Sequence, residues 1–64
     1  METIKLQFDK NDRDYMIGTI ARISKKYDGI WNPIFDEFYF ESMRQLKKFR
    51  NEIKKFKVWW TINK

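Results

Sequence analysis

The order of elements in this 64-residue chain depends on one short motif, Ser42-Met43-Arg44-Gln45. It matches a capping box, in which a serine at the start of a helix and a glutamine three residues later satisfy backbone N–H groups reciprocally. A helix already under way would have no free N–H groups for this box to cap. The motif therefore predicts that a new helix starts here and covers residues 42–56.

The residues before the box suit either a strand or an earlier start of that helix. Glu37 to Glu41 alternate polar and apolar side chains and are rich in aromatic rings, which is typical of a strand. Asn32 and Pro33 would instead suit the N-cap and first turn of one long helix. We favour a strand at 37–41 followed by the helix, and keep the uninterrupted helix, with a βααβ order, as the alternative.

Apolar periodicity predicts the other elements. Alternation of apolar and polar residues indicates strands near both ends of the chain, and apolar residues recurring every three or four positions indicate a helix between them. Asn11 is the expected N-cap of that helix and Gly29 the expected stop signal. The predicted elements are a strand at 3–8, a helix at 11–27, a short strand near 30–31, a strand at 37–41, a helix at 42–56 and a strand at 57–63.

This order is βαββαβ, the split-βαβ or ferredoxin-like arrangement, in a minimal form. The predicted fold class is α+β, with two helices on one face of a small, mostly antiparallel sheet, in a single domain over residues 1–64. The strands at 3–8 and 37–41 would be central, and the first and last strands would be neighbours. The other face of the sheet would stay open.

The open face would carry aromatic side chains that no helix covers. Trp59 falls on the opposite side of its strand from Trp60, and we expect it to share the open face with Lys5, Tyr39 and Trp31. Aromatic rings beside a cation are typical of surfaces that stack unpaired bases of nucleic acid. The alternative is that the rings only cover a thin sheet or meet across a homodimer interface.

The helix at 42–56 would also present a basic face. Residues 42–64 contain eight basic residues and one acidic residue, whereas residues 1–41 contain six basic and eight acidic ones. Such a face can follow a phosphate backbone, with an affinity that falls as salt rises, although solvated lysines are an equally ordinary explanation. The basic residues expected to face away from the core are Arg44, Lys47, Lys48, Lys54 and Lys55.

Composition excludes several kinds of site. The chain has no cysteine and no histidine, which removes disulfides, thiolate and imidazole metal sites, and Cys–His or Ser–His nucleophile pairs. No nucleophile, base and orienting residue can be grouped, so we expect no catalytic site, metal or cofactor. No apolar run exceeds three residues and no signal-peptide pattern is present, so we expect a cytoplasmic protein without membrane spans.

These features favour a small, basic, non-enzymatic binding protein that contacts nucleic acid through the 44–55 helix face, with the aromatic open face as a further candidate surface. The alternative is an inhibitor or regulator that inserts exposed aromatic residues into a host protein or ribonucleoprotein with an acidic surface. The many residues with AT-rich codons suit a low-GC bacterium or its phages and plasmids. A homodimer is expected under the first interpretation.

Overall fold

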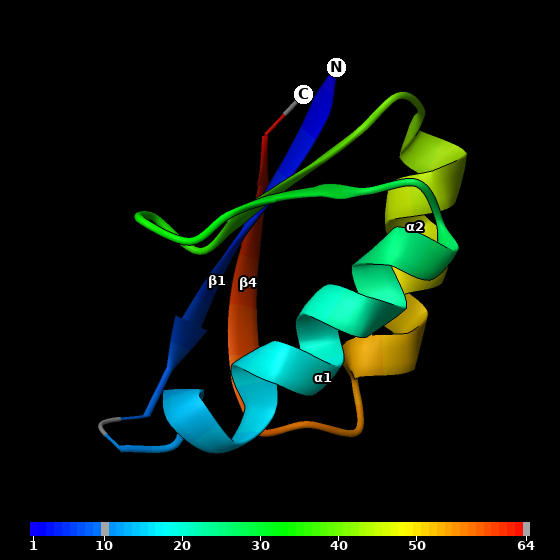
Figure 1. Ribbon diagram of the computed structural model, residues 1–64. Coiled ribbons are helices and arrows are strands. Elements are labelled where there is room, and N and C mark those ends of the chain that lie inside the picture. The colour runs from blue at the N-terminus through cyan, green and yellow to red at the C-terminus, as the bar shows by residue number, and fades with distance from the viewer. Residues whose placement is uncertain (10, 64) are drawn as a thin grey trace.

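The computed structural model describes residues 1–9 and 11–63 of the chain. Within those residues the chain forms two helices and a four-stranded sheet, in the predicted βαββαβ order. Both helices lie on the same side of the sheet (Figure 1). The elements are β1 (Glu2–Phe8), α1 (Arg13–Lys26), β2 (Ile30–Asn32), β3 (Glu37–Phe40), α2 (Met43–Ile53) and β4 (Val58–Asn63).

The strand order in the sheet is β2-β3-β1-β4, and all three neighbouring pairs are antiparallel. β1 pairs with β4 from Thr3 to Phe8, but with β3 only from Glu2 to Lys5. Each βαβ unit thus has a strand of the other unit between its own two strands, which is the split-βαβ topology. The α+β prediction is confirmed, including the central positions of β1 and β3.

The hydrophobic core lies between the sheet and the helices. Alternate residues of each strand and one stripe of each helix face it, as the apolar periodicity predicts. Phe49 of α2 occupies its centre, with its ring centroid 5.0 Å from that of Phe38 and 5.1 Å from that of Phe40. The buried hydrophobic residues are Ile4, Leu6, Ile17, Ile20, Phe38, Phe40, Leu46, Phe49, Ile53 and Val58.

The capping box forms as predicted and separates β3 from α2. The backbone N–H of Gln45 donates to the Ser42 hydroxyl at 3.3 Å, and the backbone N–H of Ser42 donates to the Gln45 side-chain oxygen at 3.2 Å. α2 ends at Ile53, earlier than the predicted residue 56. The N–H of Phe56 bonds to the carbonyl of Ile53 in a tighter i to i−3 turn, because the chain must reverse before β4.

The start of α1 differs from the prediction. The helix begins at Arg13, its N-cap is Asp12 rather than Asn11, and Asp12 makes no side-chain capping bond. Asn11 has a φ of 87° and so lies in the left-handed region, outside any helix. The loop from β1 therefore uses Asn11 to turn the chain.

The end of α1 is a Schellman motif. The N–H of Gly29 bonds to the carbonyl of Ser24 at 2.8 Å, and that of Asp28 to the carbonyl of Lys25 at 3.1 Å. Asp28, with a φ of 60°, takes the left-handed position usually given to glycine, and Gly29 does not have a positive φ. Glycine is instead required at position 29 for steric reasons, since a Cβ there would lie 2.6 Å from the Phe40 ring.

The loop between β2 and β3 explains the ambiguous Asn32-Pro33 signal. The Asn32 side-chain oxygen accepts the N–H of Ile34 at 3.1 Å, which starts a turn rather than a helix. Asp36, at the end of the loop, has a φ of 53°. Its carbonyl accepts the N–H of Leu6 at 3.0 Å, and this bond continues the β1–β3 ladder beyond the paired residues.

Candidate nucleic-acid interface and the open sheet face

The outer side of α2 and of the turn after it is basic. Leu46, Phe49 and Ile53 are fully buried, and helical periodicity turns the opposite side of the helix to solvent. All the predicted basic residues on that side are exposed, and none forms an ion pair with another described residue. This surface, the α2 basic face, comprises Arg44, Lys47, Lys48, Lys54 and Lys55.

The one carboxylate of α2 does not neutralise this face. The Glu52 side chain turns towards α1, where it accepts hydrogen bonds from the Lys26 ammonium at 3.0 and 3.2 Å and from the Tyr27 hydroxyl. These contacts hold the ends of the two helices together. The positive charge of the α2 basic face is therefore left to be balanced by solvent ions or a ligand.

The open face, on the side of the sheet away from the helices, contains Lys5, Tyr39 and Trp59 as predicted. Lys5 is exposed on β1 between the other two strands, and 53% of Trp59 is exposed. Trp59 lies opposite Gln7 and Tyr39 opposite Thr3. Their separation across two strand spacings and four residues is roughly 16 Å, too far for neighbouring bases to stack on both.

Tyr39 is held within the sheet surface rather than free to rotate. Its hydroxyl donates to the Glu37 carboxylate at 3.0 Å and accepts from the Asn32 amide at 3.4 Å. Glu37 lies directly opposite Lys5 in the β1–β3 register. A carboxylate next to both groups disfavours phosphate at this end of the open face.

Trp31 does not lie on the open face. It is directly opposite Phe38, a buried core residue, and the two rings stack with their centroids 6.2 Å apart and planes 11° apart. Opposed residues in an antiparallel pair point to the same side, so Trp31 packs under the helices. Its indole Nε1 is buried without a hydrogen-bond partner among the described residues.

The sequence interpretation missed two exposed apolar residues on the open side. Ile30 lies opposite Tyr39 on the open face, with 60% of its surface exposed. Phe35, in the β2–β3 loop, is 56% exposed, and its ring centroid lies 5.9 Å from the Lys5 ammonium. The side of the sheet on which Ile30 lies follows from the alternation along β2 once the register of β2 with β3 is known. The exposure of Phe35 instead depends on the path of the loop.

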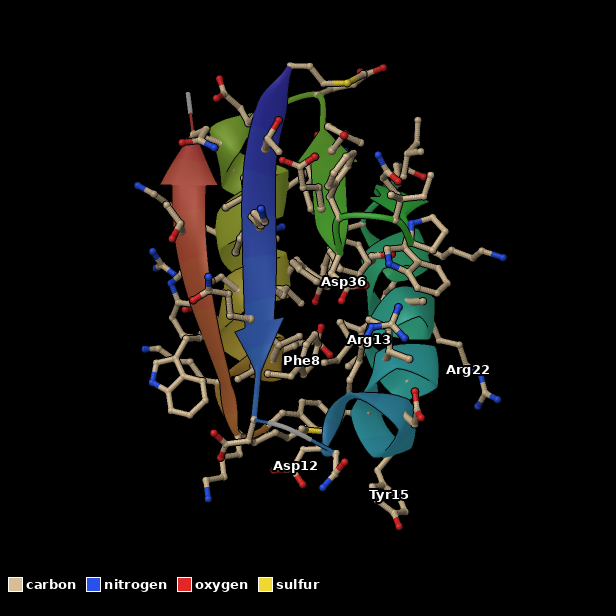
Figure 2. All side chains as sticks on the ribbon, turned by 90° about the vertical axis from the view of Figure 1, so that its left-hand side faces the viewer. Phe8, Asp12, Arg13, Tyr15, Arg22 and Asp36 are labelled. Carbon is tan, nitrogen blue, oxygen red and sulfur yellow. The ribbon has the colours of Figure 1, made fainter. Side chains whose placement is uncertain are left out.

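A shallow depression of about 550 Å³ lies beside Trp59. Arg13 and Asp36 point toward one another at its rim (Figure 2), with hydrogen bonds of 2.7 and 2.8 Å. These hydrogen bonds to Asp36 raise the pKa of Arg13 above its usual value. The charged side chains that line the depression are therefore largely paired with one another or with neighbours. The depression is lined by Leu6, Gln7, Phe8, Asp9, Asn11, Arg13, Asp36 and Trp59.

The candidate residues other than Trp31 form two surfaces on opposite sides of the molecule. Figure 2 faces the open side, with β1, β3 and β4 in front and α2 behind them. Lys5 therefore does not join the α2 basic face, and a ligand lying along α2 reaches Trp59 only by passing round the sheet. No helix in the described part of the chain has the length and apolar character to cross a membrane.

Comparison of the chain with protein-family models finds no match. Comparisons with curated proteins and with solved structures also find no significant match.

Proposed function

We propose that the protein binds nucleic acid through the α2 basic face. The observation that carries the proposal is the set of five exposed cations on one side of a short segment, without ion-pair partners among the described residues. Phosphate groups would supply the missing counter-charge, and released counterions would drive binding.

The geometry supports contact with the phosphate backbone rather than reading of bases. α2 rises about 14 Å from Arg44 to Ile53, a length over which one strand of a duplex places about four phosphates. Lysine and arginine side chains that contact phosphate fix position but carry no direct sequence information. We therefore expect binding that tolerates many sequences, of DNA or RNA.

Salt dependence tests the proposal. Replacing Arg44, Lys47, Lys48, Lys54 and Lys55 with Gln should weaken binding to labelled oligonucleotides and flatten its dependence on salt. On duplex, the slope of log K against log salt should fall by about 0.9 for each lost phosphate contact. Fluorescence anisotropy from low to physiological salt measures both quantities.

Arg22→Gln provides the matched control. Arg22 is an exposed basic residue of α1 whose side chain points away from the sheet (Figure 2). The proposal expects its loss to leave the slope nearly unchanged. No measurable affinity of the unaltered chain for single- or double-stranded DNA or RNA at low salt would refute the proposal.

The exposed apolar residues of the open side favour a second function, that of a protein inhibitor or regulator. Trp59, Phe35 and Ile30 are all more than half exposed, and large apolar and aromatic anchors dominate protein interfaces. A pull-down from lysate with and without nuclease separates the two functions. A partner that survives nuclease and is lost in Trp59→Ala would support this second function, whereas stacked single strands would be lost with nuclease.

A further inference from the structure

β4 leaves one edge of the sheet unpaired. It is the last strand in the order β2-β3-β1-β4, and among the described strands it pairs only with β1. Figure 2 shows no other described segment alongside it on the side away from β1. The strand has six residues, Val58–Asn63, with neither proline nor glycine. Natural edge strands are usually protected from pairing by proline, by charged side chains, by bulges or by covering elements, and no residue of Val58–Asn63 is charged.

The ladder shows which backbone groups point outward from β4. In an antiparallel pair, the N–H and C=O of one residue point to the same neighbour, and successive residues alternate. Leu6 donates its N–H to Asp36 on the β3 side, so its opposite residue in β4, Trp60, directs its backbone groups away from β1. Val58 and Ile62, two residues before and after, do the same.

Apolar side chains flank this edge on both sides of the sheet. Trp60 and Ile62, on the helix side, pack against the core but are only half-buried. Trp59 is more than half exposed on the open face. A further strand at this edge would cover apolar surface on both sides and satisfy the outward backbone groups.

We propose that this strand is β4 of a second copy of the chain, paired antiparallel about a two-fold axis at Trp60. Opposed residues must point to the same side of the sheet, so residues separated by an odd number cannot face each other. Of the remaining registers, the one centred on Trp60 pairs every outward-directed residue of the strand. Trp60 faces the partner's Trp60, and Val58 faces the partner's Ile62.

Charge and side-chain size agree with this register. On the helix side the opposed residues are β-branched or aromatic, pairs that stabilise sheets. On the open side Trp59 faces the partner's Thr61, and Lys57 faces the partner's Asn63. Among the described residues no two like charges are opposed, and Lys57 already lies 3.4 Å from the Asp9 carboxylate of its own chain.

The hydrogen bonds of the pairing can also be assigned. The Val58 N–H already donates to the Phe56 carbonyl at 2.9 Å, which leaves its C=O free. Each copy then donates from Trp60 to the partner's Trp60 and from Ile62 to the partner's Val58. A contact limited to one strand edge should bury less than the roughly 800 Å² per partner of a standard interface, so the dimer should form in a concentration-dependent equilibrium.

Amide exchange over a range of protein concentrations tests the proposal on the chain alone. The amides of Trp60 and Ile62 should exchange fast when dilute, and roughly tenfold more slowly when the concentration exceeds the dissociation constant about a hundredfold. The amides of Trp59, Thr61 and Asn63, which bond to β1, should be protected at every concentration. Sedimentation equilibrium should show a doubling of mass over the same range.

Proline substitutions give a matched pair of variants. Ile62→Pro removes an outward N–H, which an edge strand tolerates, and should leave a folded chain that stays monomeric. Thr61→Pro removes an N–H that bonds to β1 and should unfold the monomer instead. Ile62→Ala, which keeps the N–H, should retain measurable self-association.

A monomer up to about millimolar concentration, with fast exchange at Trp60 and Ile62, would overturn the proposal. So would a dimer whose new protection lies outside β4. Protection of these amides only after addition of a foreign extended peptide would replace the second copy with a peptide partner. None of these experiments includes nucleic acid, so their failure leaves the proposed function standing.

Discussion

At the scale of single residues, the path of the chain depends on contacts that sequence patterns do not predict. Gly29 is needed because the Phe40 ring approaches its backbone, while Asp28 adopts the left-handed conformation beside it. Asp36 connects the β2–β3 loop to two elements, through its carbonyl to β1 and through its carboxylate to Arg13 of α1. Such positions link elements that are distant in sequence.

The two glycines of the chain should respond oppositely to alanine. Gly29→Ala should lower the free energy of unfolding by about 1–3 kcal/mol, because the added Cβ meets Phe40 and the Ser24 carbonyl. Gly18→Ala should raise it by about 0.5–1 kcal/mol, because position 18 is exposed and a Cβ there would have no described atom outside its own helix within 4 Å. Urea denaturation measures both, and effects of the same sign would contradict this account.

At the scale of elements, the sequence predicts what local signals determine. The Ser42–Gln45 box identified the start of α2 because both of its partners lie within one turn. The end of α2 was predicted three residues too late, because the sharp return to β4 is a tertiary requirement. The face of the sheet on which Trp31 lies could not be predicted, because a three-residue strand is too short to show an alternation of apolar and polar residues. That face is determined by the register of β2 with β3.

The apolar stripe of α2 should dominate stability. Leu46→Ala and Ile53→Ala each remove a fully buried side chain and should cost about 2–5 kcal/mol. A domain of this size has a stability of about 5 kcal/mol or less, so either variant is expected near the point of unfolding. Asn51→Ala, on the exposed side of the same helix, should change the melting temperature little. Cooperative melting at unchanged temperature in both core variants would show that this stripe is not core.

At the scale of the whole molecule, charge and apolar exposure are separated by the sheet. The residues of the α2 basic face could be predicted because the helical periodicity of the sequence agrees with the burial of side chains over three turns. Strand alternation also predicted the side of Lys5, which lies on the open face, on the opposite side of the sheet from α2. The β4 edge could not be recognised without the strand order, since it depends on which strand lies outermost.

Salt should act in opposite directions on the two proposed interactions. Raising the salt concentration should weaken nucleic-acid binding, because each released counterion gains less entropy in a more concentrated salt solution. It should strengthen self-association, because each chain carries a formal net charge of +5 and screening reduces the repulsion between copies. Replacing the five residues of the α2 basic face with Gln leaves a formally neutral chain, in which both dependences should flatten together. Fluorescence anisotropy measures the salt dependence of nucleic-acid binding, and sedimentation equilibrium on the same samples measures that of self-association. A mass that saturates at two chains distinguishes dimerisation from aggregation. Self-association that weakens as salt rises would mean that ion pairs, rather than the β4 edges, hold the copies together.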